Sequence, residues 1–147
     1  MTLFRGTFDH SLDAKNRLTM PARYRGALAD GVVLAMPVDQ KPCVGVWRAQ
    51  EYEAYSRRAL AGLQPLSPRL AELERFFYGS SQDAELDSAG RIIVPTRLSE
   101  HAQLRKEILI VGVGDRLELW SKPLWQDHQP ELSSAVAEIT ARVDDTA

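Results

Sequence analysis

The sequence predicts an α+β fold made of two tandem copies of one strand-turn-strand-helix-hairpin unit, with further helices flanking the β core. The first observation is a motif that occurs twice. Residues 12–23 and 86–97 both read Leu-Asp-x-x-x-Arg, then three residues that suit a strand, then Pro, one small residue and Arg, at a constant offset of 74. The second is that matches at offsets of 73 to 76 continue on both sides of the motif: Phe4 with Phe77, Val32 with Ile108, Trp47 with Trp120, and Tyr52 with Trp125. Internal repeats of this kind decide the architecture of a chain.

The repeat divides the chain of 147 residues into four parts. We predict a first repeat over residues 3–63, a connecting helix over 64–76, a second repeat over 77–128 and a C-terminal tail over 129–147. A hydrophobic share of 44% is sufficient for a packed core in a chain of this length.

In the first copy, residues 3–12 and 17–20 are predicted strands joined by a turn over 13–16. Asn16 and Gly90 occupy the same place in the two copies, and both residue types tolerate positive φ, so we expect a left-handed residue just before each motif Arg. Pro21 and Pro95 stand where a helix can begin. The remaining predicted elements of this copy are a short helix over 23–28, strands over 32–36 and 43–47, and a helix over 50–63.

The second copy repeats the pattern with a short helix over 97–102 and a hairpin of strands 107–111 and 117–120. Between the copies, residues 68–77 carry apolar side chains at helical spacing. A short helix over 124–128 follows Pro123. The tail from Pro130 is mixed in composition. Leu132, Val136 and Ile139 suit a weak amphipathic helix there, and we expect the last residues to fray.

The bulk composition limits the class of protein. No apolar run is long enough to span a membrane, and the N-terminus has no signal-like segment. Cys43 is the only cysteine, which excludes an internal disulfide and suits a cytosolic protein.

The charge distribution says more than the net charge of −2. Residues 1–73 hold ten basic and seven acidic residues, whereas residues 74–147 hold eight and thirteen. Residues 4–25 alone have a balance of +3, and the matching residues 77–99 have −1. The two copies therefore share a sequence pattern but differ in net charge. This difference is the clearest indication of function in the composition.

Two interpretations of the motif remain open at this level. Asp13 and Asp87 can be purely structural, because an aspartate that caps a turn often pairs with a nearby arginine. The basic residues of the first copy form either a solvated face or a DNA-binding face; they are Lys15, Arg17, Arg23 and Arg25.

The sequence gives little support for cofactor binding, metal binding or catalysis. Residues 112–114 read Gly-Val-Gly without a third glycine or a following helix, so we reject a dinucleotide site. The histidines lack metal-ligand spacing, and no Ser, His and Asp set indicates catalysis. We therefore predict no enzyme activity, cofactor, metal or small-molecule substrate. We expect Cys43 to be a buried thiol, and Trp47 and Trp120 to be packing anchors.

Taken together, these residues resemble the MraZ family of bacterial transcriptional regulators. The resemblance covers roughly residues 3–128 and rests on motifs that occur in order. Asn16 is a departure, since the family usually has Gly there. The matching pieces are Phe4-Arg5-Gly6, residues 12–18 and 21–25, Arg75-Phe76-Phe77, residues 86–92 and residues 112–116.

The resemblance implies a fold related to the AbrB-type swapped hairpin. It also implies a ring-shaped homo-oligomer, associated with the nucleoid in the cytoplasm, that binds short DNA repeats upstream of the division and cell-wall gene cluster. The family's Asp-x-x-x-Arg motif is its proposed DNA-binding signature. It corresponds here to Asp13 and Arg17, and to Asp87 and Arg91.

Within that set, we expect Arg17 and Lys15 to make most of the DNA contact, with Asp13 orienting Arg17. Arg5, Arg23 and Arg25 are second candidates for phosphate contact. Asp87 and Arg91 are expected to be mainly structural, because their surroundings are acidic. The alternatives are an oligomeric protein-interaction scaffold that does not bind DNA and a small hydrolase, for which no nucleophile and base are found.

Overall fold

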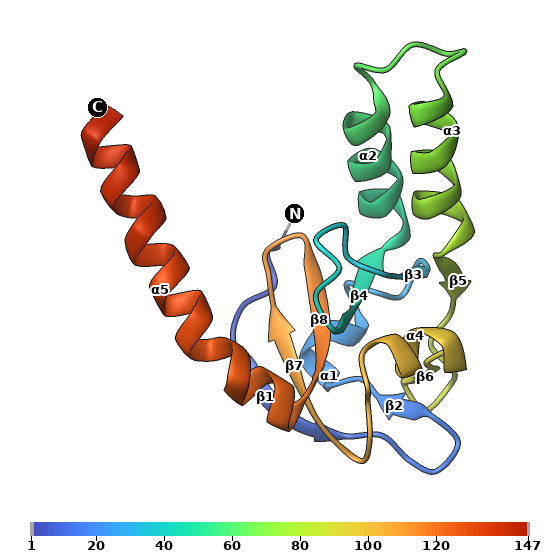
Figure 1. Ribbon diagram of the computed structural model, residues 1–147. Coiled ribbons are helices and arrows are strands. Elements are labelled where there is room, and N and C mark those ends of the chain that lie inside the picture. The colour runs from blue at the N-terminus through green and yellow to red at the C-terminus, as the bar shows by residue number, and fades with distance from the viewer. Residues whose placement is uncertain (1, 147) are drawn as a thin grey trace.

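The computed structural model describes residues 2–146, and the side chains of residues 2–143. The chain alternates short strands and helices (Figure 1). The first half contains β1 (Thr7–Ser11), β2 (Arg17–Thr19), α1 (Ala22–Arg25), β3 (Val32–Ala35), β4 (Cys43–Arg48) and α2 (Ala49–Leu60). Then come α3 (Pro68–Glu74) and a π-helical turn, η1 (Arg75–Gly79). The second half contains β5 (Gln82–Ala84), β6 (Arg91–Ile93), α4 (Thr96–His101), β7 (Glu107–Gly112), β8 (Arg116–Ser121) and α5 (Lys122–Thr146).

Six strands form one antiparallel sheet in the order β1-β7-β8-β4-β3-β5. The hairpins β3–β4 and β7–β8 meet at its centre, where β4 pairs with β8. The first strand of each half pairs with a strand of the other half: β1 pairs with β7, and β5 pairs with β3. The two remaining strands, β2 and β6, pair with each other in a separate ribbon. The α+β fold class predicted from the sequence is confirmed.

Both faces of the sheet are covered, which explains why its central strands are apolar at consecutive positions. One face packs against the β2–β6 ribbon and the short helices α1 and α4, in a core that both halves share. The opposite face carries two smaller clusters. Trp47 lies under α2 and η1 in one of them, and Trp120 lies under the start of α5 in the other. These tryptophans are 4% and 2% exposed, so their prediction as packing anchors is confirmed.

The first strand begins later than predicted, at Thr7 rather than at residue 3. Gly6 has a φ of +92°, which interrupts the extended chain before the strand starts. Upstream of it, Phe4 still joins the sheet through a single bridge to Gly114. Gly112 makes this approach possible, since a Cβ there would lie 2.6 Å from Arg5 Cα. The Gly-Val-Gly stretch thus has a structural role as the place where the N-terminal segment crosses.

The C-terminal segment differs most from expectation. In place of a short helix over 124–128 and a separate, weakly amphipathic helix in the tail, α5 is one continuous helix of 25 residues with Pro130 inside it. A proline removes one backbone hydrogen bond from a helix, but the residues that follow Pro130 are mostly strong helix formers. We expected the last residues to fray, and one of them, residue 147, lies outside the described residues. None of the helices in the described part of the chain is long and apolar enough to cross a lipid bilayer.

Candidate nucleic-acid interface

The first motif forms a tight turn that is closed by the side chain of Asp13. Its Oδ1 accepts hydrogen bonds from the backbone N–H groups of Lys15 and Arg17, both at 2.9 Å. Its Oδ2 accepts from Arg17 Nε at 2.7 Å. Asn16 has a φ of +58°, as predicted from its place before the motif Arg. The carboxylate therefore shapes the turn and orients the arginine at the same time.

The second motif repeats this geometry. Asp87 Oδ1 accepts from the backbone N–H groups of Ala89 and Arg91 at 2.9 and 2.8 Å, and Oδ2 accepts from Arg91 Nε at 2.9 Å. Gly90 has a φ of +76°. In both turns the backbone N–H of the motif Arg lowers the pKa of the aspartate, and the Arg side chain lowers it further. Both carboxylates are therefore charged at neutral pH.

The β2–β6 ribbon joins the two turns. Leu18 lies opposite Ile92 at its centre, and Arg17 and Arg91 lie opposite Ile93 and Thr19. Each turn is also tied to the other half of the chain. Val94 N–H donates to the carbonyl of Asn16 at 2.9 Å, and Met20 N–H donates to the carbonyl of Gly90 at 2.8 Å. The two turns therefore stand at opposite ends of one short ribbon.

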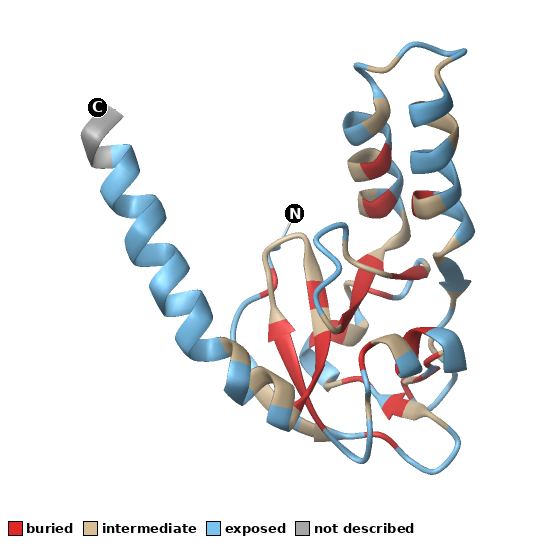
Figure 2. Ribbon diagram, in the orientation of Figure 1, coloured by how far each residue is buried: buried red, intermediate tan, exposed pale blue. Residues whose placement is uncertain are grey.

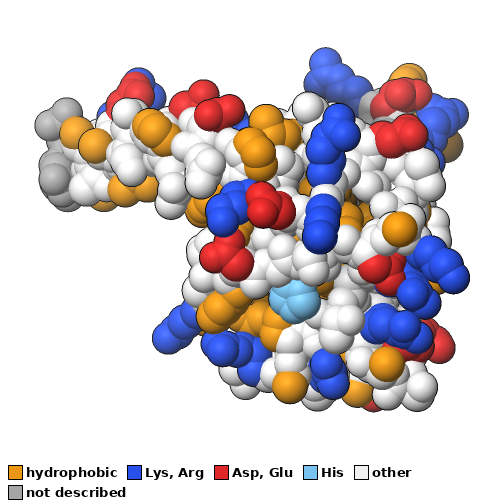
Figure 3. Space-filling model, turned by 90° about the horizontal axis from the view of Figure 1, so that it is seen from below, with side chains coloured by type: hydrophobic (Ala, Val, Ile, Leu, Met, Phe, Trp, Pro, Cys, Tyr) orange, Lys and Arg blue, Asp and Glu red, His pale blue; other side chains and the backbone are white. Residues whose placement is uncertain are grey.

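One face of this ribbon is buried and the other faces solvent. Leu18 and Ile92 are 0% and 1% exposed, whereas Ile93 is 63% exposed. Because side chains alternate along strands, Arg17, Thr19, Arg91 and Ile93 all point outward together. The two arginines are diagonal neighbours, which lie roughly 7–8 Å apart in such a pair. Lys and Arg side chains spread over much of the molecule on this side (Figure 3).

Arg25 packs against the second turn rather than standing free. Its Nε donates to the carbonyl of Met20 at 2.8 Å. Its side chain fills the space beside Gly90, where a Cβ would lie 2.6 Å from Arg25 Cζ. The repeat places Ser99, a shorter residue, at the position equivalent to Arg25, and Asn16 at the position equivalent to Gly90. The Arg25 side chain therefore leaves no room for a Cβ in the second turn, which explains the glycine there.

Arg5 and Arg23 line a second basic surface. They border an open cavity of about 590 Å³ together with Arg48, which the sequence analysis did not select. Arg48 stacks on the Phe4 ring at 4.1 Å and Arg23 on the Phe8 ring at 4.3 Å. In the described part of the chain, none of the three arginines has an acidic partner, and Arg48 Nη1 is buried without a hydrogen-bond partner. Such guanidinium groups suit phosphate oxygens.

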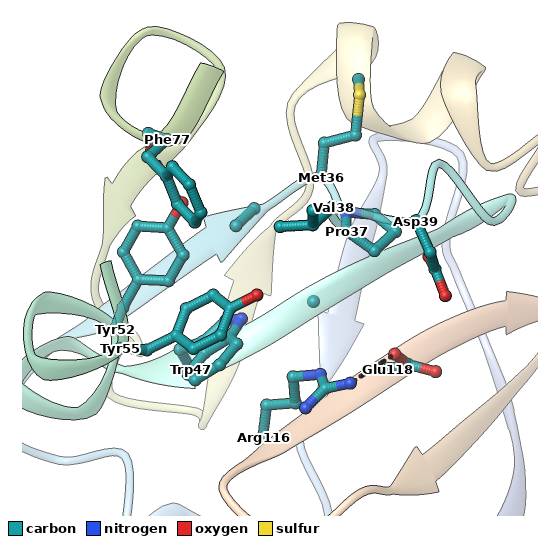
Figure 4. A pocket seen from close by; sticks show the side chains of 12 residues that line it. Met36, Pro37, Val38, Asp39, Trp47, Tyr52, Tyr55, Phe77, Arg116 and Glu118 are labelled. Atoms are coloured by element: carbon teal, nitrogen blue, oxygen red, sulfur yellow. Dashed lines mark hydrogen bonds and ion pairs between the residues drawn. The ribbon is translucent and has the colours of Figure 1, made fainter. Parts of the chain in front are cut away.

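A separate cavity of about 260 Å³ lies where α2 meets the sheet (Figure 4). Trp47 and Tyr55 stack at its wall with ring centroids 4.6 Å apart. Its charged side chains are Asp39, Arg116 and Glu118, and Arg116 is ion-paired to Glu118 at 3.4 Å. The lining residues include no Ser, Thr, Cys or His that could act as a nucleophile or as its base. Cys43 is buried, as predicted, and burial raises the pKa of its thiol.

The structure thus brings together residues that the sequence analysis ranked apart. Arg91, expected to be mainly structural, shares the solvent face of the ribbon with Arg17. Lys15 is exposed on the first turn, where the second turn has Ala89. Thr19 and Ile93 were missed. Alternation of buried and exposed residues within each motif strand was the signal that could have found them. Among the described residues, no cluster of His, Cys, Asp and Glu could hold a metal ion.

Comparison with known proteins identifies related chains. Residues 3–69 and 77–146 match a family described as "MraZ protein, putative antitoxin-like". A protein of Thermoanaerobacter pseudethanolicus named "Transcriptional regulator MraZ" is 33% identical over 141 residues, which cover 95% of this chain and 96% of that protein. Proteins of the same name from Desulfitobacterium hafniense and Hydrogenovibrio crunogenus are 36% and 34% identical, and the matches cover 92% and 95% of each chain in the pair.

Proposed function

Because the chain belongs to the MraZ family, we propose that it is a sequence-specific DNA-binding transcriptional regulator, with the β2–β6 ribbon as its reading surface. One observation carries the assignment to the ribbon. Both motif arginines point outward from a single two-stranded element whose opposite face is buried in the core. The major groove of B-form DNA is wide enough to admit a two-stranded ribbon of this kind.

Arg17 and Arg91 are the residues that read bases. Each is held at Nε by its motif aspartate, and its terminal nitrogens have no hydrogen-bond partner among the described residues. A guanidinium fixed in this way can donate two hydrogen bonds to the O6 and N7 atoms of guanine. Fixing it in advance reduces the side-chain entropy that binding would otherwise cost. Asp13 and Asp87 therefore act as positioning residues.

Phosphate contacts come from cations beside the ribbon. Lys15 lies on the first turn, and Arg5 and Arg23 line the basic cavity with Arg48. Arg25 supports the second turn, and its contribution to DNA binding is indirect. Contacts of this kind set register and affinity without reading sequence.

A single ribbon offers few contacts, so useful affinity requires several subunits on several DNA repeats. We propose that the protein acts as a ring-shaped homo-oligomer in the cytoplasm, associated with the nucleoid. Its targets are short repeats upstream of the division and cell-wall gene cluster. These details are carried over from the family that the sequence resembles.

Fluorescence anisotropy tests the function directly. The protein is titrated into labelled duplex from its own upstream region and into a scrambled duplex of equal length, each over a salt series. We expect preferential binding to the natural duplex, with affinity that falls steeply as salt rises. Equal and feeble binding to both duplexes would overturn the proposal and favour a protein-interaction scaffold.

A further inference from the structure

The outer part of α5 is an exposed helix with an apolar stripe. From Gln129 to Val143 every residue is exposed, and this segment projects away from the sheet (Figure 2). Leu132, Val136 and Ile139 are 41%, 53% and 61% exposed. Their spacing of four and three residues places them on one side of the helix, as in the contact line of a coiled coil. A single copy therefore leaves a helix-packing surface open.

The repeat provides an internal comparison for this surface. The pairs Trp47 with Trp120 and Tyr52 with Trp125 make α2 the counterpart of α5. In the first half, α3 and η1 return alongside α2 and cover it. Tyr52 Oη donates to the carbonyl of Phe77 at 2.7 Å, and Tyr78 Oη donates to Ser56 Oγ at 3.1 Å. Among the described residues, no element covers α5 in this way.

The tip of the α2–α3 hairpin has complementary properties. Leu66 is 96% exposed at the tip. Residues 54–71 contain three arginines and no acidic residue, whereas residues 127–145 contain five acidic residues and one arginine. The tip is thus apolar and basic, and α5 is apolar and acidic. The two elements diverge from the sheet in one chain, so they can meet only between copies (Figure 1).

We propose that the apolar stripe of α5 docks on the tip of the α2–α3 hairpin of a second copy of this chain. The inference deepens the proposed ring and rests on that part of the proposed function. Each copy gives one α5 and receives one on its own hairpin tip, so the contact is heterologous. Repetition of such a contact closes a ring when the rotation permits. Pairing of α5 with α5 is disfavoured, because it would bring two acidic helices together.

Two single substitutions test the two sides of this contact one at a time. Val136→Glu damages α5 and leaves the tip intact, whereas Leu66→Glu damages the tip and leaves α5 intact. Both positions are at least half exposed, so each variant should fold, which circular dichroism checks. Ser134→Glu is the matched control, because it adds the same charge on the opposite side of α5.

Molar mass is measured by light scattering after size-exclusion chromatography, without DNA. We expect each variant alone to be monomeric and the control to assemble like the wild type. Mixing the two variants should give 1:1 dimers of about twice the 16.4 kDa chain mass, because one intact α5 then meets one intact tip. An assembled Leu66→Glu variant would overturn the proposal in favour of α5 pairing, and a monomeric wild type would also overturn it. DNA binding is measured separately, so neither result decides the function of the ribbon.

Discussion

Gly90 combines a positive φ with a close contact to the Arg25 side chain in the second turn. Gly90→Ala should destabilise the fold by about 1–3 kcal/mol, because it adds a Cβ at positive φ and against Arg25. Denaturant midpoints at fixed protein concentration measure this loss. In an Arg25→Ala background, Gly90→Ala should cost less than it does in the wild type, because the steric part of the loss is absent. An unchanged midpoint in the single variant would contradict the assigned contact.

The motif aspartates predict a defined pH dependence. Backbone N–H groups lower the pKa of Asp13 and Asp87, so the turns gain stability above the unfolded pKa of about 3.9. That stability is lost as the pH falls through the lowered pKa of the folded state. Carboxyl carbon NMR titration should place both midpoints below those of unfolded aspartate. Midpoints at or above the unfolded value would show that the carboxylates do not cap the turns.

At the scale of elements, substitutions on the two faces of the β2–β6 ribbon should affect stability and DNA binding separately. Ile92→Ala should cost about 2–5 kcal/mol of stability, because Ile92 is 1% exposed in the shared core. Ile93→Ala should leave stability within about 0.5 kcal/mol and weaken DNA binding, because its side chain is 63% exposed on the reading face. Unfolding and anisotropy measurements on both variants test this. Unchanged DNA affinity in Ile93→Ala would remove that side chain from the interface.

Some elements could be predicted from the sequence and others could not. The turns over 13–16 and 87–90 were predictable, because Asp, Asn and Gly act through local backbone chemistry. The continuous α5 was not, since Pro130 is a local signal against a helix and the residues after it outweigh it. The pairing of β2 with β6 is a contact between distant parts of the chain, and local pattern carries no information about it. That pairing is also what moves Arg91 onto the face of Arg17.

At the scale of the whole molecule, the exchange of first strands joins the halves into one body. Neither half keeps its own first strand, so the repeat visible in the sequence does not correspond to two separate sheets. The duplicated motifs predicted two copies of a strand-turn-strand-helix-hairpin unit. Which half each first strand would join depends on packing across the shared core, and spacing alone does not reveal it.

The proposed assembly predicts strong dependence on the number of DNA repeats. A duplex with two correctly spaced repeats should bind at least about tenfold more tightly than one with a single repeat, because the second contact becomes intramolecular. The monomeric Val136→Glu variant should lose this advantage and keep its affinity for a single repeat. Equal gains for both proteins would show that assembly does not contribute to binding.

The most direct test of the ribbon assignment compares Arg17→Ala and Arg91→Ala with Arg75→Ala by anisotropy on the natural duplex. Arg75 is a suitable control, because it is also paired to an acidic residue and its side chain is 70% exposed on η1. We expect each ribbon variant to lose about 1–3 kcal/mol of binding free energy, roughly 5- to 150-fold in Kd, and Arg75→Ala to bind like the wild type. Wild-type affinity in both ribbon variants, with assembly intact, would contradict the account.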